Sequence, residues 1–239
     1  VEQALEATGG KPVIPPEEEI QKRIEALCRK SGLTVPSEPI TTDAKNSCWT
    51  HLYGLITYGD LFTPRQMLCL LTFAAAVREA YQTMVGQAGG TGGSPVNQGT
   101  GEPPVPPMDE ERAKAVATYL GVLVNRVADK ESVLARWDNT RENSQGTFGR
   151  QALPMVWDFV EPNPVGDASG GANGALDWII GVAEAQANSG QPAIVLRGSA
   201  TALPWPSGTG CQPVQFDAVI TDPPYYANVP YADISDFFY

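Results

Sequence analysis

The chain has 239 residues, of which 42% are apolar, and it carries 27 acidic against 16 basic side chains. This composition is ordinary for a globular protein and excludes wholesale disorder. The net charge of −11 argues against a free-standing clamp on duplex DNA, because phosphate binding needs an excess of Lys and Arg. No apolar run approaches the length of a membrane span, so we expect no membrane partner.

The residues that bind metals or form disulfides are few and scattered. The chain has four cysteines and one histidine, with no Cys-x-x-Cys pair and no second ligand at metal-binding spacing from the histidine. We therefore expect no metal site and reduced thiols in a cytoplasmic protein. The residues are Cys28, Cys48, His51, Cys69 and Cys211.

The first predicted element is a helix over residues 16–30. Three acids stand at its start and two bases at its end, which complements the helix dipole. Ile20, Ile24 and Leu27 then form one apolar stripe, and Gly32 ends the helix.

A second helix is predicted from Pro64 to about Met84. Thr63 can cap it, Pro64 suits the first helical position, and Gln66 completes a capping box. Residues 86–107 follow with seven glycines and five prolines, so we expect a flexible loop between a helical region (1–85) and the rest of the chain (108–239).

Asp109 is predicted to cap a third helix that runs through Asp129. Its expected buried face is Val116, Tyr119, Leu120, Leu123 and Val127.

Residues 151–161 fit either a strand or a short helix. Their carboxylates, Asp158 and Glu161, stand near aromatic residues and could bind a sugar hydroxyl or an adenine, but a carboxylate at a wet edge is the commoner outcome.

The remaining pattern is a helix (175–187), a buried strand (193–196), a loop rich in Pro and Gly, and a buried strand (216–221). This succession predicts an α/β fold of the doubly wound type, with ligands beyond the carboxyl ends of the strands.

The last predicted strand ends in Asp222-Pro223-Pro224-Tyr225. An Asp carboxylate and the Pro223 carbonyl can both accept hydrogen bonds from an exocyclic amino group, and an aromatic ring can stack on a planar substrate. A strand that simply stops at a proline turn is the plain alternative. A DPP-aromatic string arises by chance in only about two chains per thousand of this length, which favours a binding site.

Four stretches of the chain together resemble one family, the large adenine-specific DNA methylases that carry an N-terminal domain of unknown function. They are residues 53–66 (YGLITYGDLFTPRQ), 115–129 (AVATYLGVLVNRVAD), 147–164 (TFGRQALPMVWDFVEPNP) and 219–239 (VITDPPYYANVPYADISDFFY). The resemblance implies a Rossmann-like class I methyltransferase sheet with a helical N-terminal portion. It also implies S-adenosyl-L-methionine as methyl donor and the N6 amino group of a flipped-out DNA adenine as acceptor.

The resemblance assigns catalysis to the DPPY segment. Asp222 and the Pro223 carbonyl would accept both N6 hydrogens, while Pro224 stiffens the loop. Tyr225 would stack on the base, with Tyr226 and Asn228 beside it. This interpretation requires Asp222 to face a hollow wide enough for a purine.

The resemblance also implies cofactor contacts. The donor's carboxylate would lie at Thr63 and Pro64, although a simple helix cap explains these residues equally well. Asp222 would border the donor, and Ser199 stands where the family has an Asp that contacts the donor's adenine. No FxGxG turn is present, and the aromatic residues 237–239 would normally lie inside a domain. We therefore expect an internal fragment that acts with the remainder of its chain.

Three alternatives remain at this point. A loop of this type also serves methylation of guanine N2 in RNA and of glutamine in proteins. The chain could also be a non-catalytic subunit of a DNA-modification enzyme, in restriction–modification or another role, or a plain structural domain. The recognition sequence and the oligomeric state stay open.

Overall fold

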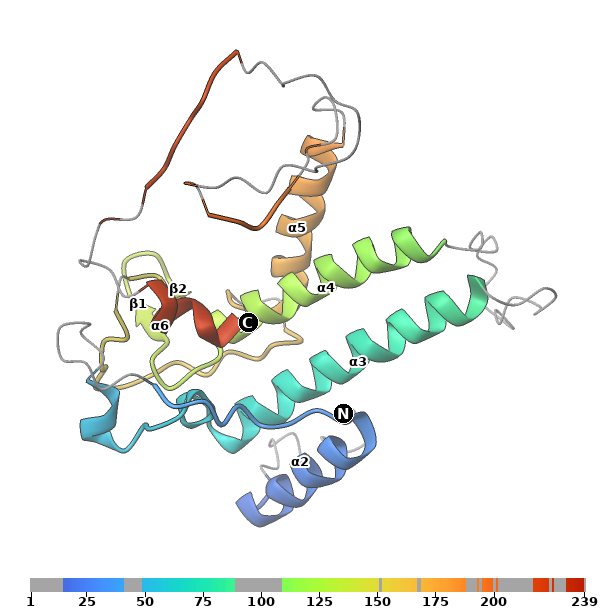
Figure 1. The fold of residues 1–239 in the computed structure, drawn as a ribbon. Coiled ribbons are helices and arrows are strands. Elements are labelled where there is room, and N and C mark those ends of the chain that lie inside the picture. The colour runs from blue at the N-terminus through green and yellow to red at the C-terminus, as the bar shows by residue number, and fades with distance from the viewer. Residues whose placement is uncertain are drawn as a thin grey trace.

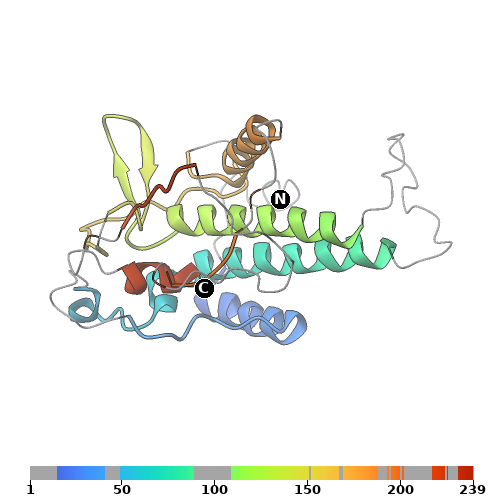
Figure 2. The same cartoon turned by 45° about the horizontal axis from the view of Figure 1, so that its top comes forward.

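The computed structural model describes residues 15–40, 49–88, 109–150, 152–166, 169–187, 193, 195–199, 201, 217–223, 225 and 231–238. Its main elements are helices α2 (Glu17–Ser31), α3 (Pro64–Ala88), α4 (Glu110–Lys130) and α5 (Ala172–Gln186). Helix α2 packs on α3, α3 on α4, and α4 on α5. Figures 1 and 2 show the long helices α3 and α4 side by side and antiparallel, with α2 and α5 on opposite sides of this pair.

The helix ends follow the local signals in the sequence. Gly32 closes α2 in the left-handed conformation at φ 68°, and the Asp109 side chain caps α4 by accepting from the Arg112 amide at 2.7 Å. Ile20 and Ile24 of α2 are buried. The expected helices 16–30, 64–84, 109–129 and 175–187 are thus confirmed, each with small shifts at its ends.

The core lies along α3, which has α2 on one side and α4 on the other. One expected member is wrong: Tyr119 of α4 is 49% exposed, because the face that packs on α3 is narrower than the sequence stripe. The buried apolar residues at the centre include Ile20, Ile24, Leu61, Phe62, Met67, Leu70, Leu71, Leu123, Val127, Leu134 and Leu153.

Short elements connect the helices. Two 3-10 turns, η2 (Thr50–Tyr53) and η3 (Tyr58–Leu61), precede α3, and α6 (Tyr231–Ser235) with η4 (Asp236–Phe238) comes last. Strands β1 (Arg136–Asp138) and β2 (Asn143–Gln145) form an antiparallel hairpin with Trp137 opposite Ser144. The sequence pattern did not predict this hairpin, because three-residue strands carry too little alternation.

The expected α/β class is wrong for the described part of the chain. The structure there is mainly helical, and its sheet is the single β1–β2 hairpin rather than a parallel Rossmann-like sheet. The expected strands near 193–196 and 216–221 are irregular where they are described, and Val195 and Ile220 are 88% and 95% exposed. An apolar run favours a parallel strand only if neighbouring strands pair with it, and the core here is closed by helices.

Two further expectations, for residues 151–161 and 86–107, can be compared with the structure. Residues 152–161 form neither of the two elements expected, because they run as an irregular segment along the hairpin and α3. The expected loop over 86–107 is wrong at residues 86–88, which belong to α3, and its other residues lie outside the described ones.

Candidate functional site

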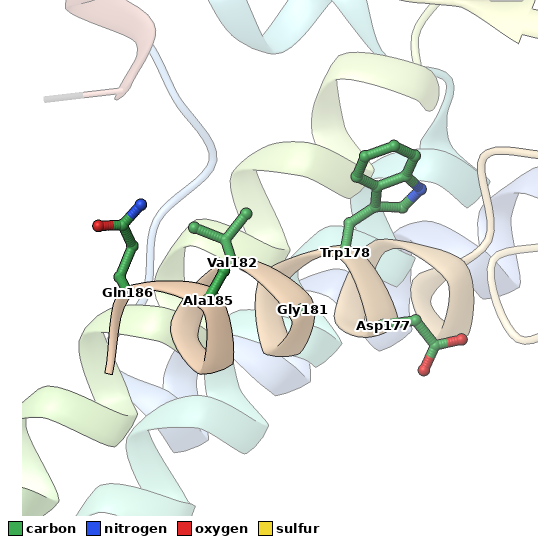
Figure 3. A pocket seen from close by; sticks show the side chains of 6 residues that line it. All are labelled: Asp177, Trp178, Gly181, Val182, Ala185 and Gln186. Atoms are coloured by element: carbon green, nitrogen blue, oxygen red, sulfur yellow. The ribbon is translucent and has the colours of Figure 1, made fainter. Parts of the chain in front are cut away.

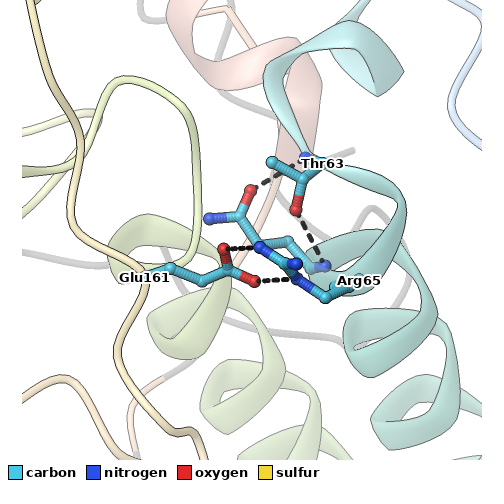
Figure 4. A network of polar contacts seen from close by, with 4 residues as sticks. Thr63, Arg65 and Glu161 are labelled. Atoms are coloured by element: carbon cyan, nitrogen blue, oxygen red, sulfur yellow. Dashed lines mark hydrogen bonds and ion pairs between the residues drawn. The ribbon is translucent and has the colours of Figure 1, made fainter. Parts of the chain in front are cut away.

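The start of α3 carries a network of polar contacts, which Figure 4 shows from close by. The Thr63 amide donates to Gln66 Oε1 at 2.8 Å, and the Gln66 amide donates to Thr63 Oγ1 at 3.3 Å. This reciprocal pair is the capping box that the sequence predicts, with Pro64 at the first helical position. It satisfies two groups that a helix start otherwise leaves open.

Arg65 ties the start of α3 to the irregular segment near residue 161. Its guanidinium donates to both carboxylate oxygens of Glu161, at 2.9 and 2.6 Å, and Figure 4 shows the two side chains face to face. The hydrogen bond to Glu161 raises the pKa of Arg65. Glu161 is an exposed residue, as expected for a carboxylate at a wet edge, and it is paired with a base.

Glu131 is buried where α4 ends, close to this pair. Only 1% of its surface is exposed, and burial followed by the negative charge of Glu161 raises its pKa to about 7. Its Oε1 atom has no hydrogen-bond partner in the described structure, and neither has the Nε2 atom of Gln66. Burial and the Glu131 charge also raise the pKa of Cys69, on the same face of α3 as Gln66, to about 11. Sequence reasoning missed Glu131, because its burial follows from tertiary packing alone.

The end of the chain packs against the residue that precedes Thr63. The Phe237 ring lies 5.6 Å from Phe62, 5.1 Å from Phe148 and 5.9 Å from Tyr58, measured between ring centroids. Phe238 adds an edge contact to Phe148 at 4.9 Å. Such contacts contribute about 0.5–1.5 kcal/mol each beyond area burial, so η4 is held firmly at the start of α3. The expectation that these aromatic residues pack inside a domain is confirmed for Phe237.

The DPPY segment itself is exposed. Asp222, Pro223 and Tyr225 are all exposed, and Tyr225 retains 62% of its surface. The Tyr225 amide donates to the Tyr231 hydroxyl at 3.2 Å, which links the segment to the first residue of α6. The other predicted site residues here, Pro224, Tyr226 and Asn228, lie outside the described residues.

Three hollows among the described residues have no lining residue from the DPPY segment. The hollows of about 460, 360 and 160 Å³ are lined by α5, by α4 with α5 and β2, and by the hairpin with residues 154–156. The requirement that Asp222 face a base pocket stays a prediction, and the structure shows that Asp222 is exposed.

The residues expected to contact S-adenosyl-L-methionine have different surroundings in the described structure. The unpartnered Gln66 Nε2 at the start of α3 suits a carboxylate, but it is shielded from solvent. Ser199, expected near the donor's adenine, is exposed, and its hydroxyl is paired with that of Thr201 at 2.8 Å. The structure places Thr63 next to Phe62, which contacts Phe237, and none of the three hollows is lined by Thr63, Pro64, Ser199 or Asp222.

Within the described ranges, no three His, Cys, Asp or Glu side chains are placed to hold a metal ion. None of the helices described is long and apolar enough to cross a bilayer. Comparison of the chain with protein-family models, with curated proteins and with solved structures finds no match.

Proposed function

We propose that this chain is part of an S-adenosyl-L-methionine-dependent methyltransferase that acts on the N6 amino group of adenine in DNA. The cytoplasm is the compartment that fits this substrate and the dispersed cysteines. The proposal rests on the DPPY segment, on the four matching stretches, and on one contact in the structure.

The contact of Phe237 with Phe62 is the observation that carries the proposal. Phe62 and Thr63 belong to the stretch that resembles a cofactor-carboxylate segment, and Phe237 follows the DPPY segment closely. More than 150 residues separate the two stretches in the sequence. Their meeting at the start of α3 is what one shared site would require.

The role assigned to this chain is to hold the N6 amino group in position by hydrogen bonds. Asp222 and the Pro223 carbonyl accept the two N6 hydrogens, which directs the nitrogen lone pair outward. These hydrogen bonds strengthen as positive charge builds on nitrogen, so they stabilise the transition state more than the ground state. Because Asp222 is exposed here, the segment has to change its position when the base binds.

The test uses the protein encoded by the whole reading frame that contains this chain. We expect transfer of a labelled methyl group to DNA, with N6-methyladenine as the product identified by mass analysis. Asp222→Ala should abolish transfer without changing the melting temperature, because the exposed side chain supports no packing. Undiminished transfer by this variant would refute the assigned role, and methylated RNA or protein as the product would refute the substrate.

A second candidate, a non-catalytic subunit of a DNA-modification enzyme, is favoured by the exposure of Asp222 and Tyr225. The two candidates differ in what the whole protein does with its donor. For these 239 residues alone we expect weak or absent calorimetric binding of S-adenosyl-L-methionine under either one. Absence of both binding and transfer in the whole protein would favour the second candidate.

A further inference from the structure

A hollow of about 360 Å³ lies between α4, β2 and the start of α5. Arg126 and Lys130 border it from α4, and Trp178 borders it from α5. Lys130 is positioned by donating to the Ser144 carbonyl at 2.9 Å. The other described residues that line it are Asn143, Ser144, Gln145, Ser169, Gly170, Gly171, Gly174 and Ala175.

The charge of this hollow is opposite to that of the chain. Its described lining contains two bases and no acid, whereas the protein as a whole has a net charge of −11. Residues 126–150, which surround the hairpin, contain five bases and four acids, and the rest of the chain contains 11 bases and 23 acids. A negatively charged ligand is therefore attracted to this part of the molecule and repelled elsewhere.

The start of α5 adds backbone donors to the two cations. Gly171 occupies the cap position and offers no side chain to accept from the first turn. The Ala172 amide donates to the Pro164 carbonyl at 2.7 Å, so the Asn173 and Gly174 amides are the ones that can donate to an anion. Gly170 before the cap residue has a positive φ of 96°, a backbone conformation that favours glycine. A Cβ atom built on Gly174 has no heavy atom within 4 Å, so this side of the first turn is open.

Trp178 provides an apolar face beside the cations. It is 69% exposed, and the Arg126 guanidinium carbon lies 5.9 Å from its ring centroid. Figure 3 shows Trp178 and Val182 projecting from one side of α5, away from Asp177. An exposed indole beside a guanidinium suits a flat aromatic group that carries a negative charge nearby.

We propose that this hollow binds a backbone phosphate of single-stranded DNA, with an adjacent base stacked on Trp178. Arg126, Lys130 and the amides at the start of α5 hold the phosphate. A single strand is implied because a base paired in a duplex cannot present its face to an exposed indole. The inference rests on the proposed DNA substrate and adds a backbone contact outside the DPPY segment.

The test measures binding of a short fluorescein-labelled oligodeoxynucleotide to the chain by polarisation over a range of salt concentrations. Arg126→Gln should weaken binding and lower the salt dependence by about 0.7 in log–log slope, as one phosphate contact is lost. Arg112→Gln, the same charge change on the first turn of α4, is the matched control and should leave both unchanged. Trp178→Ala should weaken binding about fivefold or more, and Trp178→Phe should restore most of it.

Gly174→Glu separates binding from folding. The new side chain enters open space, and a carboxylate in the first turn favours the helix, so the melting temperature should stay the same or rise. Its charge should nevertheless abolish oligonucleotide binding, while Gly174→Gln, of equal size, should weaken it much less. Equal binding by the Glu and Gln variants would overturn the proposal.

A parallel titration with inorganic phosphate identifies the source of the anion. Weak phosphate binding that depends on Arg126, beside tighter oligonucleotide binding that depends on Trp178 as well, is the expected result. If phosphate binds as tightly as the oligonucleotide, or Trp178→Ala changes nothing, the nucleic-acid assignment is wrong. These measurements involve no methyl transfer, so their failure is distinct from failure of the proposed enzyme activity.

Discussion

Glu131 should make the protein less stable as the pH rises through neutrality. It is 1% exposed at the end of α4, and its Oε1 atom lacks a hydrogen-bond partner in the described structure. Burial and then the charge of Glu161 raise its pKa from the ordinary 4.5 to about 7. Glu131→Gln replaces the carboxyl with a neutral group of the same shape and so imitates the protonated acid at every pH.

The magnitude follows from the two pKa values. An acid whose folded pKa exceeds its unfolded pKa binds its proton more tightly in the folded state, so ionisation opposes folding. The free energy of unfolding is then unaffected below pH 4.5, falls between pH 4.5 and 7, and changes no further above about pH 7. At about 1.4 kcal/mol per pKa unit, the wild type should lose at most about 3 kcal/mol that Glu131→Gln retains.

The assay is urea unfolding of both proteins by tryptophan fluorescence at a series of pH values from 4 to 8.5, roughly spanning the two pKa values. The difference between the proteins isolates Glu131, because other titrating groups contribute nearly equally to both. We expect no difference near pH 4 and the full excess stability of the variant above pH 7. A difference that stays constant with pH would refute the buried, proton-binding role of Glu131.

Four further substitutions test packing and backbone conformation elsewhere in the structure. Phe237→Ala should lower the free energy of unfolding by about 2–3 kcal/mol, less than for a fully buried ring, because Tyr58 and Phe62 lose a partner. Gly170→Ala should lower the free energy of unfolding by about 1–2 kcal/mol, because φ is 96° and the new Cβ would lie 3.1 Å from a Pro162 side-chain atom. Gly181→Ala, in open space within α5, should raise it by about 0.5–1 kcal/mol. Arg65→Ala should cost at most about 1 kcal/mol, yet it should move the Glu131 transition to higher pH, because Glu161 then loses its counter-charge. All are measured by urea unfolding, the last over the same pH series.

The helices could be predicted because their signals are local. The Asp109 cap, the Thr63–Gln66 capping box and the left-handed Gly32 each act within one turn, and all three occur in the structure. The polarity of α2 and its buried Ile20 and Ile24 follow from the same short-range pattern.

The fold class could not be predicted because a sheet is a property of pairs of segments. Residues 217–221 have the composition of a buried strand, but composition does not specify a partner strand. Pairing in the described chain goes instead to residues 136–138 and 143–145, where the Asp138 carboxylate shapes the turn by accepting from the Thr140 and Arg141 amides.

The candidate site was predictable only in part for the same reason. Thr63 and Pro64 stand out by spacing, and the terminal aromatic residues stand out by composition. The burial of Glu131 and the pairing of Arg65 with Glu161 do not stand out. Glu131 lies about 66 residues, and Glu161 about 96 residues, after Arg65, and no sequence period encodes contacts over such separations.

The contacts of Phe237 also determine how far the DPPY segment can move. The Tyr225 amide is bonded to Tyr231, and the five residues of α6 with the three of η4 span about 13 Å from there to Phe238. Asp222, three residues before Tyr225, can extend about 10 Å further. Asp222 can therefore approach the start of α3 while the aromatic contacts stay intact, so the proposed activity needs a moved segment and not an opened core.

Activity measurements can show whether the Phe237 contacts serve function or packing alone, which stability measurements cannot. If the aromatic contacts hold the segment near α3, Phe237→Ala should lower kcat/KM for methyl transfer well beyond its effect on folding. Ile24→Ala is the matched control, since Ile24 is a buried core residue of α2, on the other side of α3 from α4. At a temperature where both variants are folded, the control should keep its activity and Phe237→Ala should not. Equal losses would mean that the contact is packing alone and that the two stretches meet without functional consequence.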